Sequence, residues 1–108
     1  MKRKVVKNMC GGEGEVTTSY ILDETQLTGN CSLFAVVRIE SGSSLGYHEH
    51  HGECETYYIL SGEGEYDDNG IKRRVKEGDV TVTPDGFGHA IKPVTQEPLI
   101  FIALILKD

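Results

Sequence analysis

The chain has 108 residues and a formal net charge of −6, which favour one domain with a single hydrophobic core and argue against a nucleic-acid-binding protein. No apolar stretch approaches the ~20 residues of a membrane-spanning helix, and no apolar core of a secretion signal follows the basic start. The three cysteines form no CxxC pair, and Cys10 and Cys31 lack metal-type spacing, so we expect a cytoplasmic protein without disulfides.

Short apolar runs separated by glycine-rich segments dominate the chain. Residues 1–15 carry no clear pattern and are expected to form an N-terminal arm, whereas residues 22–27 could form one helical turn. Beyond them, β-branched and apolar runs predict strands at Ser32–Ile39, Cys54–Leu60, Asp79–Pro84, His89–Val94 and Leu99–Leu106. The last run is apolar throughout, so we expect it to be buried on both faces of a sheet.

Two turns are marked by their residue types. The Asn-Gly pair within Asp67–Gly70 supplies the positive φ angles of a tight hairpin turn, and the segment Asp85–Gly88 reverses the chain before His89. Many short strands joined by such turns are typical of an all-β barrel or sandwich. The sequence therefore predicts an all-β fold, without a linker or repeat to divide it.

Three of the four histidines lie within the short segment HEHH. Because strand side chains alternate between faces, His48 and His50 point to one side. Glu55 shares a face with Tyr57, and His89 opens a later strand, so both can point inward. The histidine pair alone could be an exposed strand, and His89 alone a hydrogen-bonded loop residue. An unpaired Glu55 would be costly inside a barrel. Together, three imidazoles and one carboxylate suit Mn, Fe, Co, Ni or Zn ions with open positions for water or substrate.

The spacing of these residues resembles the two motifs of the cupin superfamily. The first motif of Gly, HxH, Glu and Gly is matched by Gly42, His48, His50, Glu55 and Gly62. The second motif of Gly, PxG and His is matched by Gly78, Pro84, Gly86 and His89. Pro93 stands where the second motif ends in Asn, a residue that is not a metal ligand in the family. The departure therefore puts only the local turn in doubt.

The resemblance implies a single-domain jelly-roll barrel, also called a double-stranded β-helix, over residues 1–108. It carries over one divalent transition metal ion (Mn, Fe, Zn, Ni or Co), with the ligands His48, His50, Glu55 and His89. Small cupins of this kind dimerise through sheet faces and N-terminal strands. A homodimer is therefore expected, and residues 1–15 are candidates for its interface.

Three neighbours of the ligand set are candidates for binding a substrate or taking part in its conversion. Tyr57 lies two positions beyond Glu55 on the same face, where it could support the ligands or move a proton; plain core packing is the alternative. Arg38 interrupts an apolar strand and could hold a carboxylate or phosphate, although a solvent-facing arginine is the simpler interpretation. Phe87 precedes His89 and could line the mouth of the pocket.

Other conspicuous side chains are expected to point away from the metal ligands. His51 has the outward parity of Glu49 and is assigned to the surface or an interface. Cys54 should face away from Glu55, which argues against a thiolate ligand. Surface or interface positions are also expected for Tyr47, Tyr58 and Lys92.

The sequence leaves the chemistry open among three functions and favours the first of them. The first is a metal-dependent enzyme of isomerase, lyase or decarboxylase type that acts on a small sugar, sugar acid or carboxylate, or a dioxygenase if the metal is iron. The second is a non-catalytic, metal-dependent binder of a small carboxylate or sugar. The third is a sensor or structural cupin whose metal only stabilises the barrel. Fold resemblance does not decide among them.

Overall fold

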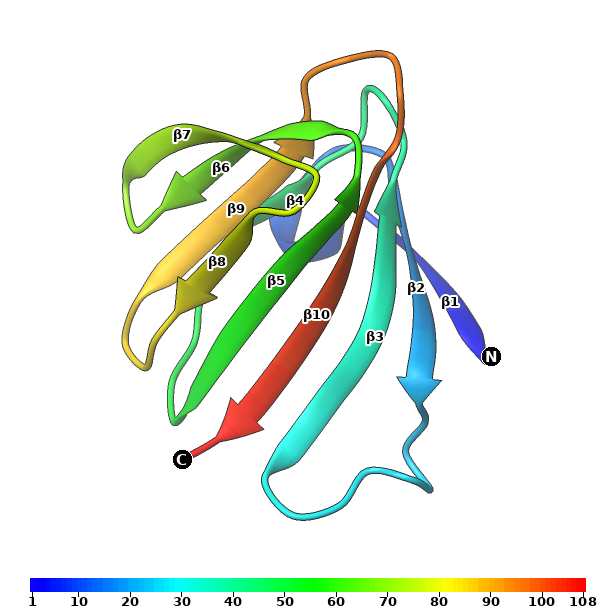
Figure 1. The fold of residues 1–108 in the computed structure, drawn as a ribbon, viewed down its shortest axis with the longest axis vertical. Helices are drawn as coiled ribbons and strands as arrows, with labels where there is room; N and C mark the ends of the chain where they lie inside the picture. Colours follow the sequence, from blue (N-terminus) through cyan, green and yellow to red (C-terminus); the bar gives the residue numbers. More distant parts are fainter.

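The chain folds into two antiparallel β-sheets that face each other, as the computed structural model of residues 1–108 shows (Figure 1). The elements are β1 (Arg3–Lys7), the 3-10 turn η1 (Met9–Gly11), β2 (Glu15–Leu22), β3 (Cys31–Ile39), β4 (Leu45–Glu49), β5 (Glu53–Ser61), β6 (Glu63–Asp68), β7 (Ile71–Lys76), β8 (Val80–Thr83), β9 (Gly88–Pro93) and β10 (Leu99–Lys107). One sheet has the order β1-β2-β3-β10-β5-β8 and the other β4-β9-β6-β7. The all-β prediction is confirmed. No element is a helix of the length and hydrophobicity that crossing a membrane requires.

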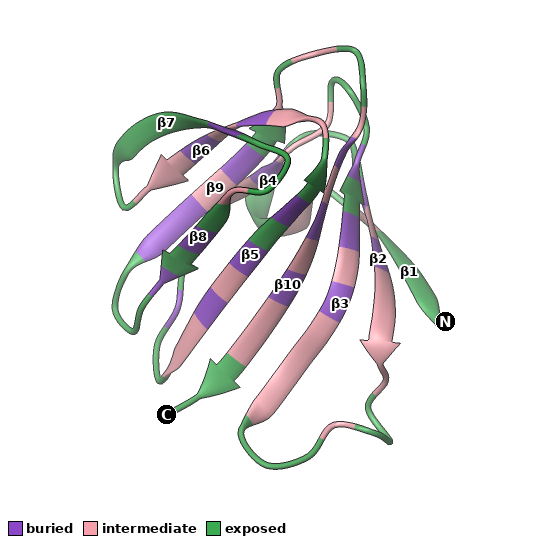
Figure 2. Ribbon diagram, viewed as in Figure 1, coloured by how far each residue is buried: buried purple, intermediate pink, exposed green.

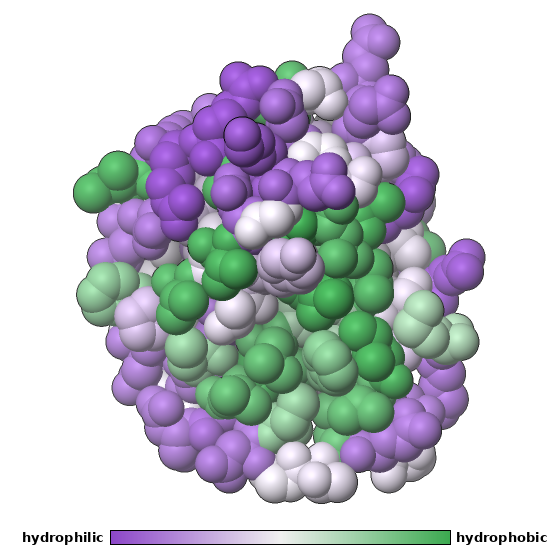
Figure 3. Space-filling model, viewed as in Figure 1, coloured by the Kyte–Doolittle hydropathy of each residue, from purple (hydrophilic) through white to green (hydrophobic).

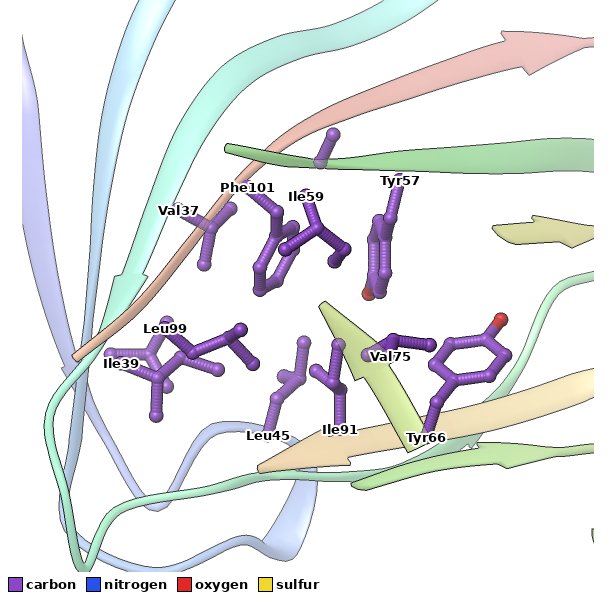
Figure 4. Close-up of a cluster of buried hydrophobic side chains, with 12 residues drawn as sticks. Val37, Ile39, Leu45, Tyr57, Ile59, Tyr66, Val75, Ile91, Leu99 and Phe101 are labelled. Carbon is purple, nitrogen blue, oxygen red and sulfur yellow. The ribbon is translucent and has the colours of Figure 1, made fainter. Parts of the chain in front are cut away.

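The hydrophobic core fills the space between the two sheets (Figure 4). Ile39, Ile59 and Phe101 project from the six-stranded sheet towards Leu45 and Ile91 of the four-stranded sheet, and all five are at most 5% exposed. Buried residues alternate with more exposed ones along the strands, most clearly in β8 (Figure 2). This alternation is the period of two that directs every second side chain into the core.

The hairpin turn between β6 and β7 has the predicted form. Asn69 and Gly70 have φ angles of 51° and 98°, as a tight two-residue turn requires. The Gly70 N–H donates to the Asp67 carboxylate over 2.7 Å. The segment at residues 22–27 holds a single turn: the N–H groups of Gln26 and Leu27 both donate to the Asp23 carbonyl directly after β2.

The apolar strand β10 is buried on one face only, so the prediction of burial on both faces is wrong. Leu99, Phe101 and Ala103 point into the core and are at most 1% exposed. The residues between them are only partly buried, and Leu106 is 46% exposed. The physical reason is that no element of the chain covers the outer side of this sheet.

The outer side of the six-stranded sheet therefore carries an apolar surface, which we call the outer apolar face. It is the broad hydrophobic patch over the middle strands in Figure 3. Its members are side chains of β3, β5, β8 and β10, namely Phe34, Val36, Tyr58, Leu60, Val80, Val82, Ile100, Ile102, Leu104 and Leu106. A contiguous apolar surface of this kind is typical of an interaction site.

The N-terminal residues, for which the sequence predicts an arm, hold the edge strand β1 and the turn η1. β1 pairs with β2 in antiparallel register, and η1 packs against β4. The approach is close, because a Cβ at Gly46 would collide with the Cys10 carbonyl oxygen and one at Gly12 would collide with the Ser44 carbonyl oxygen. These two glycines bring η1 over the end of the space between the sheets.

Candidate metal centre

Four side chains from three strand ends converge between the two sheets. His48 lies near the end of β4 and His50 just beyond it, Glu55 lies near the start of β5, and His89 near the start of β9. His48 and His89 are direct partners across the β4–β9 ladder. One ligand atom from each of the four residues lies within 4.8 Å of all the others. The structure thus brings together the whole ligand set that the sequence predicts.

The spacing of the four ligand atoms suits a single metal ion. His89 Nε2 lies 3.0 Å from His50 Nε2 and 3.1 Å from His48 Nε2. Glu55 Oε1 lies 2.8 Å from His50 Nε2 and 3.0 Å from His89 Nε2. Two ligand atoms that each lie ~2.1 Å from one ion, with a right angle between the two bonds, are ~3.0 Å apart. These separations are therefore those of neighbouring ligands around one transition metal ion.

Hydrogen bonds on the far side of two imidazoles aim their Nε2 atoms at the cluster. His48 Nδ1 lies 2.8 Å from the Gly46 carbonyl oxygen, and His50 Nδ1 lies 2.8 Å from Glu53 Oε1. A carbonyl and a carboxylate only accept, so both Nδ1 atoms carry the proton. In the neutral rings, the Nε2 lone pairs then face the cluster, as metal ligation requires.

His89 is supported by two hydroxyl groups. Its Nδ1 lies 2.8 Å from both Thr83 Oγ1 and the Tyr66 hydroxyl, which are themselves 2.7 Å apart. Either oxygen can accept the Nδ1 proton and leave Nε2 free. Sequence reasoning missed Thr83 and Tyr66 because their contacts with His89 form only when the strands assemble. It also missed Glu53, although its spacing of three residues from His50 was a local signal that could have found it.

The four ligand atoms need a positive charge between them. Three ring nitrogens and a carboxylate oxygen meet there, in side chains that are at most 21% exposed. Buried acceptors without a donor or cation between them are strongly unfavourable. A divalent metal ion would satisfy all four at once, whereas in its absence the cluster must take up protons. The residues present therefore fit the metal that the cupin resemblance implies.

The pKa shifts within the cluster have opposite directions for its members. Burial tends to raise the pKa of Glu55, but in the metal-free cluster any proton held by the Nε2 atoms of His48 and His89 stabilises the carboxylate and lowers this pKa to about 2. Burial lowers the pKa of His89. Burial also acts against His48, but Glu55 and the Gly46 carbonyl together raise its pKa. At neutral pH Glu55 is thus ionised and His89 is neutral, the forms that bind metal.

A change at Glu53 tests the support given to His50. We expect Glu53→Ala to weaken metal binding about 10–100-fold, because removing a partner that orients a ligating imidazole typically has this effect. Competition with a chromophoric chelator measures the affinity. The matched control is Glu49→Ala, since Glu49 is exposed and pairs with His51 over 3.3 Å. Equal affinities for the two variants would mean that Glu53 does not support the site.

A cavity of about 230 Å³ lies beside the cluster. Its wall includes three of the candidate ligands and is otherwise uncharged. The lining residues are Met9, Cys10, Thr18, Tyr20, Leu33, Val37, Leu45, His48, His50, Glu55, Tyr57, Ala103 and Ile105. No lysine or arginine is among them, so Glu55 is the only acidic or basic residue of the wall apart from the imidazoles.

Tyr57 is placed both to pack in the core and to reach the candidate ligands. Its ring belongs to the core and stacks on His89 with a centroid distance of 4.8 Å. Its hydroxyl is 3.4 Å from His89 Nε2, at the edge of the cluster. Burial raises the pKa of this hydroxyl well above its ordinary value, so Tyr57 keeps its proton at neutral pH.

Arg38 and Phe87 are not brought to the cavity. Arg38 lies on the outer side of β3 and pairs with Glu40, Nε to Oε1, over 2.9 Å. It faces outward because Val37 and Ile39 on either side face the core. The Phe87 side chain is 44% exposed. Its carbonyl oxygen accepts a hydrogen bond from the backbone N–H of His50 over 3.0 Å.

The residues that were expected to point outward do so. The His51 side chain is 72% exposed, and Tyr47, Tyr58 and Lys92 are also exposed. Cys54 does not line the cavity. The surface predictions for these side chains are therefore confirmed.

Two cavity residues escaped sequence reasoning, Met9 and Cys10 of the turn η1. They reach the cavity wall because Asn8 and Cys10 both adopt left-handed backbone angles, with φ values of 51° and 53°. No local pattern signals this, because neither position is a glycine and the segment has no strand or helix period.

Comparisons with known proteins agree with this fold. The family model Cupin_2, described as a cupin domain, matches residues 35–105. An oxalate-binding protein from Thermotoga maritima is 42% identical over 101 residues, which are 94% of this chain and 84% of that protein.

Solved structures give the same result for the fold. A crystal structure from Thermotoga maritima, described as a predicted oxalate decarboxylase, superposes with a TM-score of 0.95 at 39% identity and covers 100% of this chain and 94% of its own. A Cupin 2 conserved barrel domain protein from Salinispora arenicola has a TM-score of 0.73 at 23% identity, with 85% and 76% of the two chains covered. This second likeness concerns the fold alone.

Proposed function

The chain belongs to the Cupin_2 family of cupin domains, and we propose that it is a metal-dependent protein that binds a small carboxylate such as oxalate. The observation that carries the proposal is the cluster of His48, His50, Glu55 and His89 beside a cavity of about 230 Å³. The similar protein from Thermotoga maritima is an oxalate-binding protein, which supports a carboxylate as the ligand class.

The cavity itself favours a carboxylate over a sugar. Nine of its thirteen lining residues are hydrophobic, so few groups can pair with the many hydroxyls of a sugar. A bound metal ion would supply the positive charge that a carboxylate needs. His48, His50, Glu55 and His89 would hold that ion, and the apolar wall would exclude water from the ligand.

Binding has better support than catalysis in this site. A decarboxylation requires a proton to replace the lost carboxyl group, and Tyr57 holds the hydroxyl that lies 3.4 Å from His89 Nε2. Its raised pKa makes it a hydrogen-bond donor rather than a ready acid. A decarboxylase is the second candidate, because the similar solved structure is described as a predicted one.

Titration calorimetry with metal-loaded protein tests the proposal. Samples loaded with Mn²⁺, Fe²⁺, Co²⁺, Ni²⁺ or Zn²⁺ are titrated with oxalate, and we expect binding that a chelator abolishes. Chromatography of the same mixtures for formate tests turnover. Formate that disappears in Tyr57→Phe would favour the decarboxylase. A fully metal-loaded protein that binds neither oxalate nor any other small carboxylate would contradict the proposed function.

A homodimer is part of the proposal, and the outer apolar face supports it. On this face, Tyr58, Val80 and Val82 are 44–53% exposed. A second copy related by a two-fold axis presents the same surface, so apolar side chains would meet apolar side chains. Burial of such side chains is favourable by about 25 cal/mol per Å² of apolar area removed from water.

Placing a charge on this face is expected to separate the dimer. We expect Val82→Lys to sediment at the monomer mass of 11.9 kDa, because a buried unpaired ammonium is unfavourable in an apolar interface. The control is Ile71→Lys, at a 73% exposed position on the other sheet, which should leave the assembly unchanged. Sedimentation velocity measures both. An unmodified protein that is monomeric at micromolar concentration would refute the dimer.

A further inference from the structure

The cavity extends well beyond the metal cluster. It runs across the six-stranded sheet from Glu55 on β5 to Ile105 on β10, Leu33 on β3 and Tyr20 on β2, all of which line it. Ile105 is the direct partner of Glu55 and also of Leu33. Because neighbouring strands are ~4.8 Å apart, Leu33 lies roughly 10 Å from Glu55 across the sheet.

Oxalate would occupy only the end of this space. The cavity measures about 230 Å³, room for roughly seven waters at ~30 Å³ each. An oxalate ion has only six non-hydrogen atoms and is too short to reach from the cluster to Leu33, which lies roughly 10 Å from Glu55. The remaining part is lined mainly by apolar side chains, among them Leu33, Val37 and Ala103, and its wall has no cationic side chain to pair with a second charged group.

Charge also argues against a dianion. The Glu55 carboxyl group faces the cavity, and no lysine or arginine lines the wall. A divalent ion and one ligating carboxylate have a net charge of about +1, which a monoanion balances and a dianion exceeds. A monoanion with an apolar tail meets both the charge and the shape of the cavity.

We propose that the preferred ligand is a 2-oxo acid with a short alkyl side chain. Its head places a carboxylate next to a second oxygen, as oxalate does, and carries one negative charge instead of two. The head lies at the cluster of His48, His50, Glu55 and His89, and the alkyl chain lies along Ala103 towards Leu33. This inference rests on the proposed function and specifies its ligand.

The experiment is a calorimetric series on the metal-loaded protein with oxalate, glyoxylate, pyruvate, 2-oxobutyrate and 2-oxovalerate. We expect affinity to rise about fourfold for each added CH₂ group, the gain that its burial provides, and 2-oxovalerate to bind more tightly than oxalate. The variant Leu33→Asn should lower the affinity for 2-oxovalerate at least tenfold and leave that for oxalate unchanged. Thr18→Val, which extends the apolar wall, should keep or increase the gain in affinity for each added CH₂ group.

The outcomes separate this inference from the proposed function. Tight oxalate binding with a flat or falling 2-oxo acid series would overturn the 2-oxo acid and leave carboxylate binding intact. Equal losses for oxalate and 2-oxovalerate in Leu33→Asn would also overturn it. Absence of binding by every acid, in protein that thermal unfolding shows to be folded and metal-loaded, would overturn both.

Discussion

Replacing His48 with alanine is expected to weaken metal binding more than about 100-fold, because losing a residue that merely supports a ligand already weakens binding about 10–100-fold. His48 is the most exposed of the four candidate ligands, at 21% of its side chain, so its truncation leaves the core almost intact. Elemental analysis should find close to one ion per chain in the unmodified protein and almost none in His48→Ala.

Thermal unfolding gives an independent measure of the same loss. A metal that binds only the folded chain stabilises it by about 1.4 kcal/mol for each tenfold by which the free metal concentration exceeds the Kd. The melting temperature of the unmodified protein should therefore rise with metal, and that of His48→Ala should not. The matched control is His51→Ala, because His51 is 72% exposed and lies outside the cluster. A His48→Ala protein that still holds one tight ion would remove His48 from the ligand set.

Replacing Phe101 with alanine is expected to lower the free energy of unfolding by about 3–5 kcal/mol, as for other buried phenylalanines. Phe101 is fully buried, and its ring centroid lies 4.3 Å from that of Tyr57. Tyr57 in turn stacks on His89. The void left by the ring would thus loosen a candidate ligand as well as the core, so weaker metal binding should accompany the loss of stability.

Urea denaturation of the metal-free protein measures this effect. A loss of this size is a large part of the 5–15 kcal/mol that stabilises a typical domain. The control is Phe87→Ala: its side chain is 44% exposed, so the change should stay within about 0.5 kcal/mol. If Phe101→Ala costs less than about 1 kcal/mol, the stack of Phe101, Tyr57 and His89 does not support the site as described.

Side-chain parity explains why part of the site could be predicted and also why Arg38 was a poor candidate. The same alternation that places His48 and His50 on one face directs Arg38 outward, because its neighbours Val37 and Ile39 face the core. For Phe87 no such rule exists, since turn residues lack a period. Its exposure became clear only from the structure.

The sequence by itself determined the all-β class and the four converging ligand residues, His48, His50, Glu55 and His89. Strand alternation and the turn glycines and prolines placed these side chains where they could converge. The resemblance to the two cupin motifs then implied that they are the metal ligands.

Only the tertiary structure decided what surrounds those ligands. Glu53 is only three residues from His50, and their contact depends on the turn between β4 and β5. The hydroxyl partners of His89, the cavity wall formed by η1 and the uncovered outer apolar face depend on how separate strands and turns assemble. Such contacts arise from the order in which strands pair and from the close approach that Gly12 and Gly46 permit. Local periodicity carries no information about them, which is why the ligand residues could be read from the sequence but the chemistry of the cavity could not.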